Sequence, residues 1–587
     1  MKKQKTAEHK QGQLVLPIFA ALGALFGSGA IIGITVLTSP ALQWRLITAL
    51  LPEYAVCFAI LFVCILGYGS IYKPFALVTL PVTCLACGVR TTFASAPYAR
   101  PLVIALVFTV LCAASVAASI WALQKFPEPI KKSGKKLPAS AYAIALTALA
   151  AALSLALYIV LLHSRLQTLQ TGNTSGAEIG QMLYFMQHSG KPFTTLIAGQ
   201  PQSYFAIQFA PLWYLLLPVY MLFGHSMLAV GTAIYALMLT ALVPLWRICR
   251  RYALSPWQTA ALCAACALCP LVVGGGASGG ALSMLSLPLL LWVADACDGK
   301  HPYLALIPLA LCLCIGFEVS VWTTFICLYL AFSAPAERRR SGIVCTIVAA
   351  TATVATAVYL AVAGSPVITA LFSGIDLQAG QKLLFLMLLL APFALLPLFC
   401  KQKSALVLLF PLVLFHLVVN ASVYSGAFCT YAFSAVAAAA LLSVKGLASL
   451  RTEIKGISLA RVLPALALCA AMLMATPYAA TLHALYVKTD EQAQTDAARM
   501  HELLDTLPEN AAVSASDSLF AALCDRTWLF SLDAQPESPA TNVLVIDLRE
   551  EYTTSDTEQY GIAYYQSLGY TLRDDLSREG ILAVLFK

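Results

Sequence analysis

Charged side chains are scarce in this chain. Asp, Glu, Lys and Arg make up 11% of its 587 residues, whereas hydrophobic residues make up 60%. About a quarter of the residues in soluble domains are charged, so this composition excludes an ordinary soluble protein. Apolar runs long enough to cross a bilayer, which takes roughly 20 residues, recur along residues 1–480. Lipid is therefore the solvent of most of the chain.

Acidic residues are especially few in the apolar part. Residues 1–485 hold 29 Lys and Arg against 10 Asp and Glu, whereas residues 486–587 hold 7 against 18. The formal net charge of +8 is therefore the sum of a basic membrane region and an acidic tail. A charge divided in this way does not indicate binding to nucleic acid.

Cysteines are almost absent from the tail, where only Cys524 of the 18 is found, and this argues against a disulfide framework. Cys84 and Cys87, like Cys263 and Cys266, have CxxC spacing but stand among Ala, Leu and Val without a nearby histidine. We interpret them as small packing residues. No metal-site residue is predicted.

The hydrophobic pattern predicts an all-α polytopic membrane protein with a small α/β domain at its C-terminus. We expect about fifteen spanning or half-spanning helices. The expected spans are residues 14–38, 54–72, 74–88, 101–123, 140–162, 226–247, 257–273, 279–297, 303–316, 319–333, 342–362, 381–399, 404–420, 429–446 and 460–480. The first is interpreted as an anchor, because no small-residue cleavage site follows it.

These spans divide the chain into four regions. Residues 1–163 are expected to form an N-terminal membrane region with about five spans. Residues 164–225 form the first large extracytoplasmic loop, with interfacial helices. Residues 226–485 form a membrane core with about ten spans or half-spans, and residues 486–587 form a soluble extracytoplasmic α/β domain.

The positions of Lys and Arg predict the orientation, since short cytoplasmic loops are enriched in these residues. With the N-terminus in the cytoplasm, the basic clusters all fall on the cytoplasmic side; they are 125–136, 247–251, 338–340, 401–403 and 445–455. An odd number of spans then places the C-terminal domain outside the cytoplasm.

This agreement requires that the apolar stretch 205–223 does not cross the membrane. Pro211 and Pro218 interrupt it, and its Trp and Tyr side chains suit the depth of the bilayer interface. We therefore expect a helix that lies at the outer interface or dips into it.

The tail alternates helical and strand patterns, which predicts a small α/β unit. The expected elements are a helix over 491–507, a strand over 511–516, a short helix over 517–524, a strand over 542–548, a helix near 556–568 and a final strand over 581–587.

Few acids remain for a site on the outer face. In the membrane part only Glu53, Glu178, Glu318 and Asp376 lie near that face. A general base or a divalent-metal ligand must therefore come from these four residues or from the acidic tail.

Glu178 lies in the longest outer loop, 163–205, together with Arg165, His188 and Lys191. Such cations are suited to bind a lipid diphosphate, and the segment after Glu178 is expected to form an amphipathic interfacial helix. The alternative is a solvated loop with interfacial anchors.

Glu318 stands where two short apolar segments meet. This pattern predicts a broken helix with the carboxylate at its tip, and a carboxylate near membrane depth is a candidate functional group. A tip residue that reaches interfacial water is the alternative. His416, Asn420 and Tyr431 flank a later outer loop, and each is interpreted first as a hydrogen-bonding residue between packed helices.

A series of short motifs runs from the large loop to the last spans. The motifs are Glu178-Ile179-Gly180, Gly190-Lys191-Pro192, Gln208-Phe209-Ala210-Pro211, Phe317-Glu318-Val319 and Thr430-Tyr431. Together with the tail, they resemble DUF2079, a family of bacterial membrane proteins that is related in architecture to the membrane glycosyltransferases of the C superfamily (GT-C).

The resemblance implies a GT-C-like helical bundle and a polyprenyl-phosphate-linked sugar donor on the extracytoplasmic face. It implies that Glu178 is the base or the ligand of a divalent metal ion, and that Arg165 or Lys191 holds the phosphate. The remaining expected substrate-binding residues are His188, Gln208, Glu318 and Tyr431.

Three functions stay open. The first is this glycosyltransferase, with membrane lipid and the lipid-linked sugar as partners. The second is a non-catalytic relative that assists envelope glycopolymer assembly, because Gln208 replaces a family histidine and residues 274–280 lack a family acid and histidine. The third is a transporter, which the broken segment at Glu318 favours and the absence of repeated halves disfavours.

Overall fold

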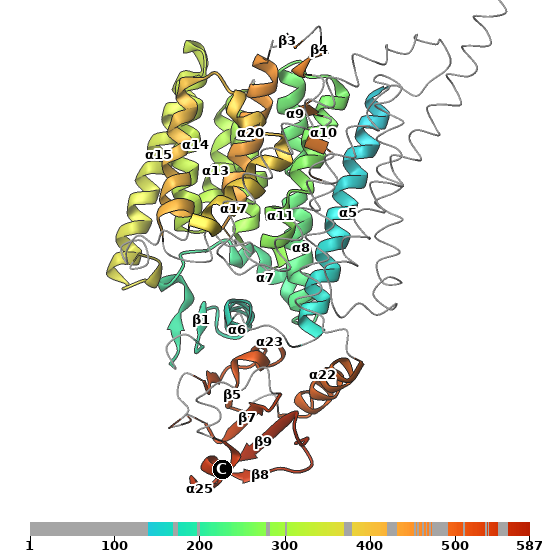
Figure 1. The fold of residues 1–587 in the computed structure, drawn as a ribbon. Coiled ribbons are helices and arrows are strands. Elements are labelled where there is room, and N and C mark those ends of the chain that lie inside the picture. Colours follow the sequence, from blue (N-terminus) through green and yellow to red (C-terminus); the bar gives the residue numbers. More distant parts are fainter. Residues whose placement is uncertain are drawn as a thin grey trace, which may run out of the picture.

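A computed structural model of the chain describes residues 139–587, apart from gaps of which the longest are 369–378, 420–430, 472–490 and 550–560. The four expected spans before residue 139, and most of 460–480, lie outside the described residues. The described part is a helical bundle with a small sheet region at one end (Figure 1).

The bundle is built from apolar helices. They are α5 (Ala139–Gln167), α8 (Met227–Leu239), α9 (Leu242–Arg251), α10 (Pro256–Ala267), α11 (Pro270–Ala277), α12 (Ser286–Cys297), α13 (Leu306–Leu313), α14 (Phe317–Ser333), α15 (Ala336–Val362), α17 (Ala379–Leu390) and α20 (Phe433–Ser449). Short 3-10 turns precede two of them, η2 (Leu282–Leu285) before α12 and η3 (Pro302–Ala305) before α13.

Four stretches are long and apolar enough to cross a bilayer: Ala143–Gln167, Met227–Arg251, Pro256–Gly276 and Arg339–Val362. A crossing takes roughly 20 residues, and these stretches have 21 to 25. The other helices are shorter, as expected for half-spans. The polytopic membrane architecture predicted from hydropathy is therefore present in the described part of the chain.

Polar caps begin two of the bundle helices. The Ser226 hydroxyl accepts from the Ala229 backbone N–H at 3.3 Å and starts α8. Ser255 and Gln258 form a capping box at the start of α10, where Pro256 occupies the first turn. These residues satisfy N–H groups that lack a partner inside the helix, so they define where each helix leaves its loop.

The backbone between α17 and α20 departs from regular helix. It contains 3-10 turns η4 (Ala391–Phe393), η5 (Leu396–Phe399) and η6 (Lys403–Leu408), then α18 (Leu409–Pro411) and the π-helical η7 (Leu412–Val418). Prolines at 392, 397 and 411 remove backbone donors. Regular spans were expected over 381–399 and 404–420, and the prolines explain why shorter turns replace them.

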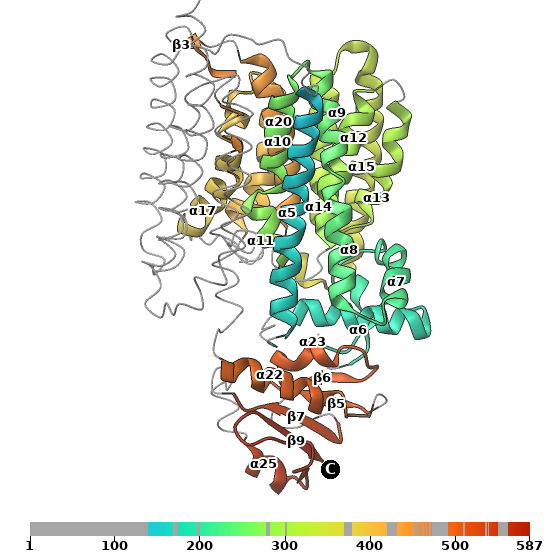
Figure 2. The same cartoon turned by 90° about the vertical axis from the view of Figure 1, so that its right-hand side faces the viewer.

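Helix α7 (Trp213–Leu222) shows that the stretch 205–223 does not cross the bundle. Its 10 residues span about 15 Å, half of the hydrocarbon thickness. The chain then turns back into α8, and Figure 2 shows α7 beside α6 and α8 at the sheet end of the bundle.

The basic loops gather at the end of the bundle far from the sheet. The Lys445 ammonium donates to the Ser333 hydroxyl at 3.1 Å and lies over the rings of Tyr252 and Tyr329. Tyr329 in turn donates to Gln402 at 3.0 Å. The hairpin of β3 (Glu453–Ile454) and β4 (Ile457–Ser458) lies at the same end (Figure 1). The basic clusters that lie within the described residues, 247–251, 338–340, 401–403 and the start of 445–455, therefore share one end of the structure, whereas 125–136 lies outside them.

A buried carboxylate ties two helices together at this basic end. Asp295 of α12 is 2% exposed and lies 2.9 Å from Arg247 Nε and 2.8 Å from Arg251 Nη2 of α9. Arg251 also donates to the Asp295 backbone carbonyl at 2.8 Å. Attraction between these charges offsets the cost of burying the carboxylate.

Replacing Asp295 by Asn is expected to destabilise the protein by about 1–3 kcal/mol, because the amide keeps the shape and loses both ion pairs. The cost stays moderate because Arg247 is 56% exposed and reaches solvent. Thermal unfolding of the purified protein in detergent measures it, with Arg340→Gln as an exposed control at the same end. Equal unfolding temperatures for Asp295→Asn and wild type would contradict the role of the ion pairs.

The C-terminal region is a mixed sheet of five strands in the order β6-β5-β7-β9-β8. Strand β5 runs parallel to β6 and β7, and β9 runs antiparallel to β7 and β8. The strands are β5 (Val513–Ala515), β6 (Leu529–Ser531), β7 (Val543–Asp547), β8 (Thr571–Leu572) and β9 (Leu582–Phe586), and the helices are α22 (Glu491–Leu504), η8 (Asp517–Leu519), α23 (Phe520–Leu523) and α25 (Ile562–Ser567).

The three strands expected near 511–516, 542–548 and 581–587 are all present as β5, β7 and β9. Strands β6 and β8 were not expected, because runs of two or three residues carry no readable alternation. The helix expected near 556–568 is described only as α25, since residues 550–560 lie in a gap.

Candidate functional site

A thin layer of chain separates the bundle from the sheet region (Figure 1). It consists of α6 (Thr174–Ser189), the antiparallel pair β1 (Phe193–Thr194) and β2 (Gln202–Ser203), and the turn η1 (Tyr204–Ala206). Most of this layer is the large loop in which the acidic motif was found. It therefore places Glu178 between the apolar helices and the acidic domain.

Tyr204 is the centre of a polar group that includes two of the predicted site residues. Burial raises the pKa of its hydroxyl well above the usual value, and the nearby Tyr431 and Glu178 side chains raise that pKa further. The phenol therefore stays neutral and able to donate. Glu178 and Tyr431 are both half-buried, and they come from α6 and from the turn before α20.

Gln208 connects this group to the start of α14. Its Oε1 accepts from the Tyr204 hydroxyl at 3.3 Å, and a Cβ at Gly316 would lie 3.0 Å from its Nε2. Two further bonds hold the loop, one from Leu212 N–H to Cys314 O at 3.1 Å, in the turn between α13 and α14, and one from Ser365 Oγ, after α15, to Ile207 O at 2.6 Å. The Gln208 motif is therefore in contact with the residue that precedes the Phe317-Glu318-Val319 motif.

Glu318 lies in the first turn of α14, two residues after Gly316, and is 4% exposed. Neither carboxylate oxygen has a hydrogen-bond partner among the described residues. Ser434 of α20 lies beside it, but the Ser434 hydroxyl donates to Ser286 at 3.0 Å. The Nε1 of Trp322, one turn further along α14, is also buried without an acceptor in the described part.

A buried carboxylate without a donor is costly and is retained mainly for function. Of the two interpretations of Glu318, the tip residue that reaches interfacial water does not fit its burial. The broken apolar segment is confirmed, because α13 ends at Leu313 and α14 starts at Phe317.

Arg165 lies apart from the other two predicted cations, His188 and Lys191. Arg165 is buried at the end of α5 and interacts electrostatically with Tyr158. His188 and Lys191 are exposed at the far end of α6, where His188 Nδ1 lies 2.9 Å from Tyr184 O and Lys191 lies over the Phe193 ring. The structure therefore brings together Glu178, Gln208 and Tyr431 around Tyr204. It does not bring these cations into that group, and Glu318 lies separately in the first turn of α14 beside Ser434.

Among the described residues, no group of three or more His, Cys, Asp or Glu side chains is placed to hold a metal ion. The polar group around Tyr204 offers one carboxylate, phenols and an amide, a set that suits hydrogen bonding better than the oxygen-rich shell of Mg²⁺ or Ca²⁺.

Gln181, three residues after Glu178, joins the layer to the sheet region. Its Oε1 accepts from Thr194 Oγ1 at 2.7 Å and from the Thr195 N–H at 2.9 Å. Its Nε2 donates to Thr195 Oγ1 at 2.8 Å and to the carbonyls of Arg526 and Thr527 at 3.4 and 3.3 Å. Gln181 and Tyr204 do not stand out in the sequence, since neither an amide nor a tyrosine is rare in this chain.

Gly180 explains the glycine of the first motif. A Cβ at this position would lie 2.6 Å from Cys524 Sγ and 3.1 Å from Cys524 Cβ. Cys524 is buried just after α23, so α6 and α23 approach closely only because residue 180 has no side chain.

Gly180→Ala is expected to weaken the contact between α6 and α23 by about 1–3 kcal/mol, the usual cost of overpacking. Thermal unfolding and the rate of tryptic cleavage in the tail measure this loss. Adding Cys524→Ala should recover part of it, because the closest clashing atom is then removed. A Gly180→Ala protein as stable as wild type would show that α6 and α23 have room to separate.

The apolar bundle, with four stretches of spanning length, defines a polytopic membrane protein. The chain belongs to the family of predicted membrane proteins described as DUF2079, whose sequence pattern matches residues 165–573. This match confirms the family indicated by the motifs from Glu178 to Tyr431. No curated protein matches the chain.

Two solved structures share similarity with the fold. They are crystal structures of ArnT from Cupriavidus metallidurans, one in the apo state and one bound to undecaprenyl phosphate. Each has a TM-score of 0.46 and covers 76% of this chain and 98% of ArnT, with sequence identities of 14% and 15%.

Proposed function

We propose that this protein is a GT-C-type membrane glycosyltransferase that takes a polyprenyl-phosphate-linked sugar as its donor on the extracytoplasmic face. The observation that carries the proposal is that Glu178 and Tyr431 both act electrostatically on the buried Tyr204. These residues come from distant parts of the chain, yet they meet at the end of the apolar bundle, where a lipid-linked donor and a polar acceptor have access to the same layer.

Glu178 is assigned the role of general base. Its carboxylate accepts the proton of the acceptor hydroxyl while that oxygen forms a bond to the anomeric carbon of the sugar. The bond between the anomeric carbon and the phosphate oxygen breaks, and the polyprenyl phosphate leaves with the bonding electrons. Tyr431 is assigned to donate a hydrogen bond to a sugar hydroxyl. The Tyr204 oxygen is assigned to accept one, because its O–H is donated to Gln208, which orients the phenol.

The phosphate is assigned to Arg165 or Lys191, both of which belong to the same large loop or its border. Lys191 is exposed and reaches a headgroup from the aqueous side, whereas Arg165 is buried at the end of α5 and acts from within the bundle. His188 and Glu318 complete the proposed substrate-binding residues. Charge-assisted bonds of this kind are about twice as strong as neutral ones.

Purified protein in proteoliposomes tests the proposal. Polyprenyl phosphates that carry different sugars are supplied together with a mixture of envelope glycans as acceptors, and the released polyprenyl phosphate is measured. We expect release from at least one donor that depends on the protein. Absence of release from every donor, with folded protein in the membrane, would favour the non-catalytic alternative.

The proposal requires the sheet region to lie outside the cytoplasm. The gathering of basic loops at the opposite end of the bundle supports this orientation. In sealed right-side-out vesicles, Gln566→Cys in the tail should react with a membrane-impermeant maleimide. Arg340→Cys at the basic end should react only after permeabilisation, and wild type provides the background. The reverse labelling pattern would contradict the orientation and remove Glu178 from the outer face.

A non-catalytic role in envelope glycopolymer assembly is the second candidate. Gln208 favours it, because this residue takes the place of a family histidine and is held by Tyr204 and Gly316 as a packing element. Under this alternative the layer between bundle and sheet serves as a binding surface, and the acidic tail recruits a partner. Transfer activity in the proteoliposome assay separates the two candidates.

A further inference from the structure

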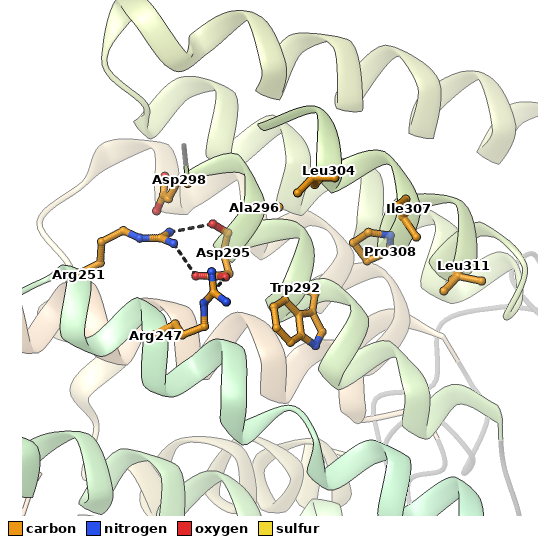
Figure 3. A pocket seen from close by; sticks show the side chains of 11 residues that line it. Arg247, Arg251, Trp292, Asp295, Ala296, Asp298, Leu304, Ile307, Pro308 and Leu311 are labelled. Carbon is orange, nitrogen blue, oxygen red and sulfur yellow. Dashed lines mark hydrogen bonds and ion pairs between the residues drawn. The ribbon is translucent and has the colours of Figure 1, made fainter. Parts of the chain in front are cut away.

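A groove of about 860 Å³ opens at the basic end of the bundle, on the side opposite the sheet region. It lies between the end of α9, the end of α12 and the segment formed by η3 and α13 (Figure 3). The proposed glycosyl transfer does not use this groove, because the polar group around Tyr204 lies at the other end of the helices.

One end of the groove is cationic. Arg247 is 56% exposed, whereas its ion-pair partner Asp295 is 2% exposed, so the guanidinium is the more accessible of the two charges. Arg251, Asp295 and Asp298 line the same end of the groove. Arg247 uses its Nε for Asp295, and its two terminal nitrogens donate to no described residue. The guanidinium lies 5.5 Å from the ring of Trp292, which holds it at the mouth of the groove.

The acidic neighbours do not cancel this charge. Asp295 is shared between Arg247 and Arg251, and Asp298 interacts with the buried Lys445. Three cationic side chains therefore face two carboxylates at this place. The four free N–H groups of Arg247 form a planar fork that suits a phosphate.

The other end of the groove is apolar. Leu304, Ile307, Pro308 and Leu311 form a row that leads away from the arginines along η3 and α13 (Figure 3). The exposed fractions of Leu304 and Ile307 are 47% and 63%, so part of this wall faces lipid. From residue 304 to residue 311 the row advances about 10 Å toward the middle of the bundle.

We propose that this groove binds an anionic phospholipid of the inner leaflet. The phosphate is held by the free end of Arg247 and by Arg251, and one acyl chain lies along Ile307 and Leu311. Basic pockets between spanning helices on the cytoplasmic side are suited to anionic headgroups. A soluble phosphate is a poorer match, because it leaves the apolar row uncovered, whereas a phospholipid matches both ends of the groove.

The full-length protein in detergent tests the proposal by native mass spectrometry with added phosphatidylglycerol or phosphatidylcholine. Wild type should retain phosphatidylglycerol in preference to phosphatidylcholine. Arg247→Gln should weaken phosphatidylglycerol binding about tenfold or more, the usual effect of losing a charge-assisted bond. Ile307→Trp keeps every charge and fills the apolar row, so it should weaken binding of the same lipid comparably.

Arg340→Gln is the matched control, since it removes one exposed charge from the same end of the bundle and does not line the groove. It should bind phosphatidylglycerol like wild type. Equal binding of the two lipids by wild type, or an equal loss in Arg340→Gln and Arg247→Gln, would overturn the proposal, as would displacement of the lipid by glycerol phosphate at the same concentration. Because Ile307→Trp leaves the ion pairs at Asp295 in place, full binding by a folded Ile307→Trp protein would overturn it as well.

Discussion

Glu178→Gln is expected to lower the rate of sugar transfer by about 100-fold to 10,000-fold, the usual contribution of a general base. The amide keeps the size of the side chain and cannot accept the proton of the acceptor hydroxyl. Because the residue is half-buried, the substitution should leave folding intact. The measurement is release of polyprenyl phosphate in proteoliposomes at saturating donor, which separates a lower kcat from weaker donor binding.

The control for this prediction is Glu502→Gln, the same chemical change on the exposed face of α22, where Glu502 pairs with Arg499. Its transfer rate should equal that of wild type. Equal rates for Glu178→Gln and wild type would remove Glu178 from the mechanism. A loss shared by both variants would point to the acidic tail as a whole rather than to a base.

Gln181→Leu is expected to destabilise the protein by about 3–5 kcal/mol, since several buried groups lose partners at once and each costs about 1–3 kcal/mol. The groups are the Thr194 hydroxyl, the Thr195 N–H and the carbonyls of Arg526 and Thr527. The lost hydrogen bonds are those that hold the large loop against the sheet region. A lower unfolding temperature in detergent and faster tryptic cleavage near Arg526 are the expected readouts.

Gln187→Leu is a matched control on the same helix. Its Oε1 is buried without a hydrogen-bond partner among the described residues, so an apolar replacement removes a polar atom that already lacks a partner. We expect its stability to equal or exceed that of wild type. If both substitutions destabilised α6 equally, loss of glutamine as such, rather than the Gln181 network, would explain the result.

Glu178→Gln and Gln181→Leu also separate an effect on the transfer reaction from an effect on the packing of the large loop against the sheet region. Glu178 and Gln181 lie one turn apart on α6, yet one faces the polar group at Tyr204 and the other bonds the sheet region. A variant that unfolds the contact at Gln181 should therefore also lower transfer if the tail covers the site. Glu178→Gln should lower transfer while the tail stays resistant to trypsin.

Part of the candidate site could be predicted from the composition of the chain. Acids are so few in the apolar region that Glu178 and Glu318 stand out there, and the family motifs add Gln208 and Tyr431. The sequence could not predict which of these residues lie near one another. Glu178 and Tyr431 come near Tyr204 from segments that are far apart in the chain. His188 and Lys191 share the loop of Glu178, but the geometry of α6 carries them to its far end.

The amino-acid sequence by itself determined that this is a membrane protein, that the basic loops among the described residues gather at one end of the bundle, and that the tail contains strands. The hydropathy and charge of a residue determine whether lipid or water solvates it favourably, so these features can be inferred from short stretches of sequence. The tertiary structure alone decided that Gly180 must lack a side chain, that Gln181 joins the loop to the sheet region, and that Arg247 faces an apolar groove. Each of these depends on atoms brought together across long stretches of chain, which no local pattern encodes.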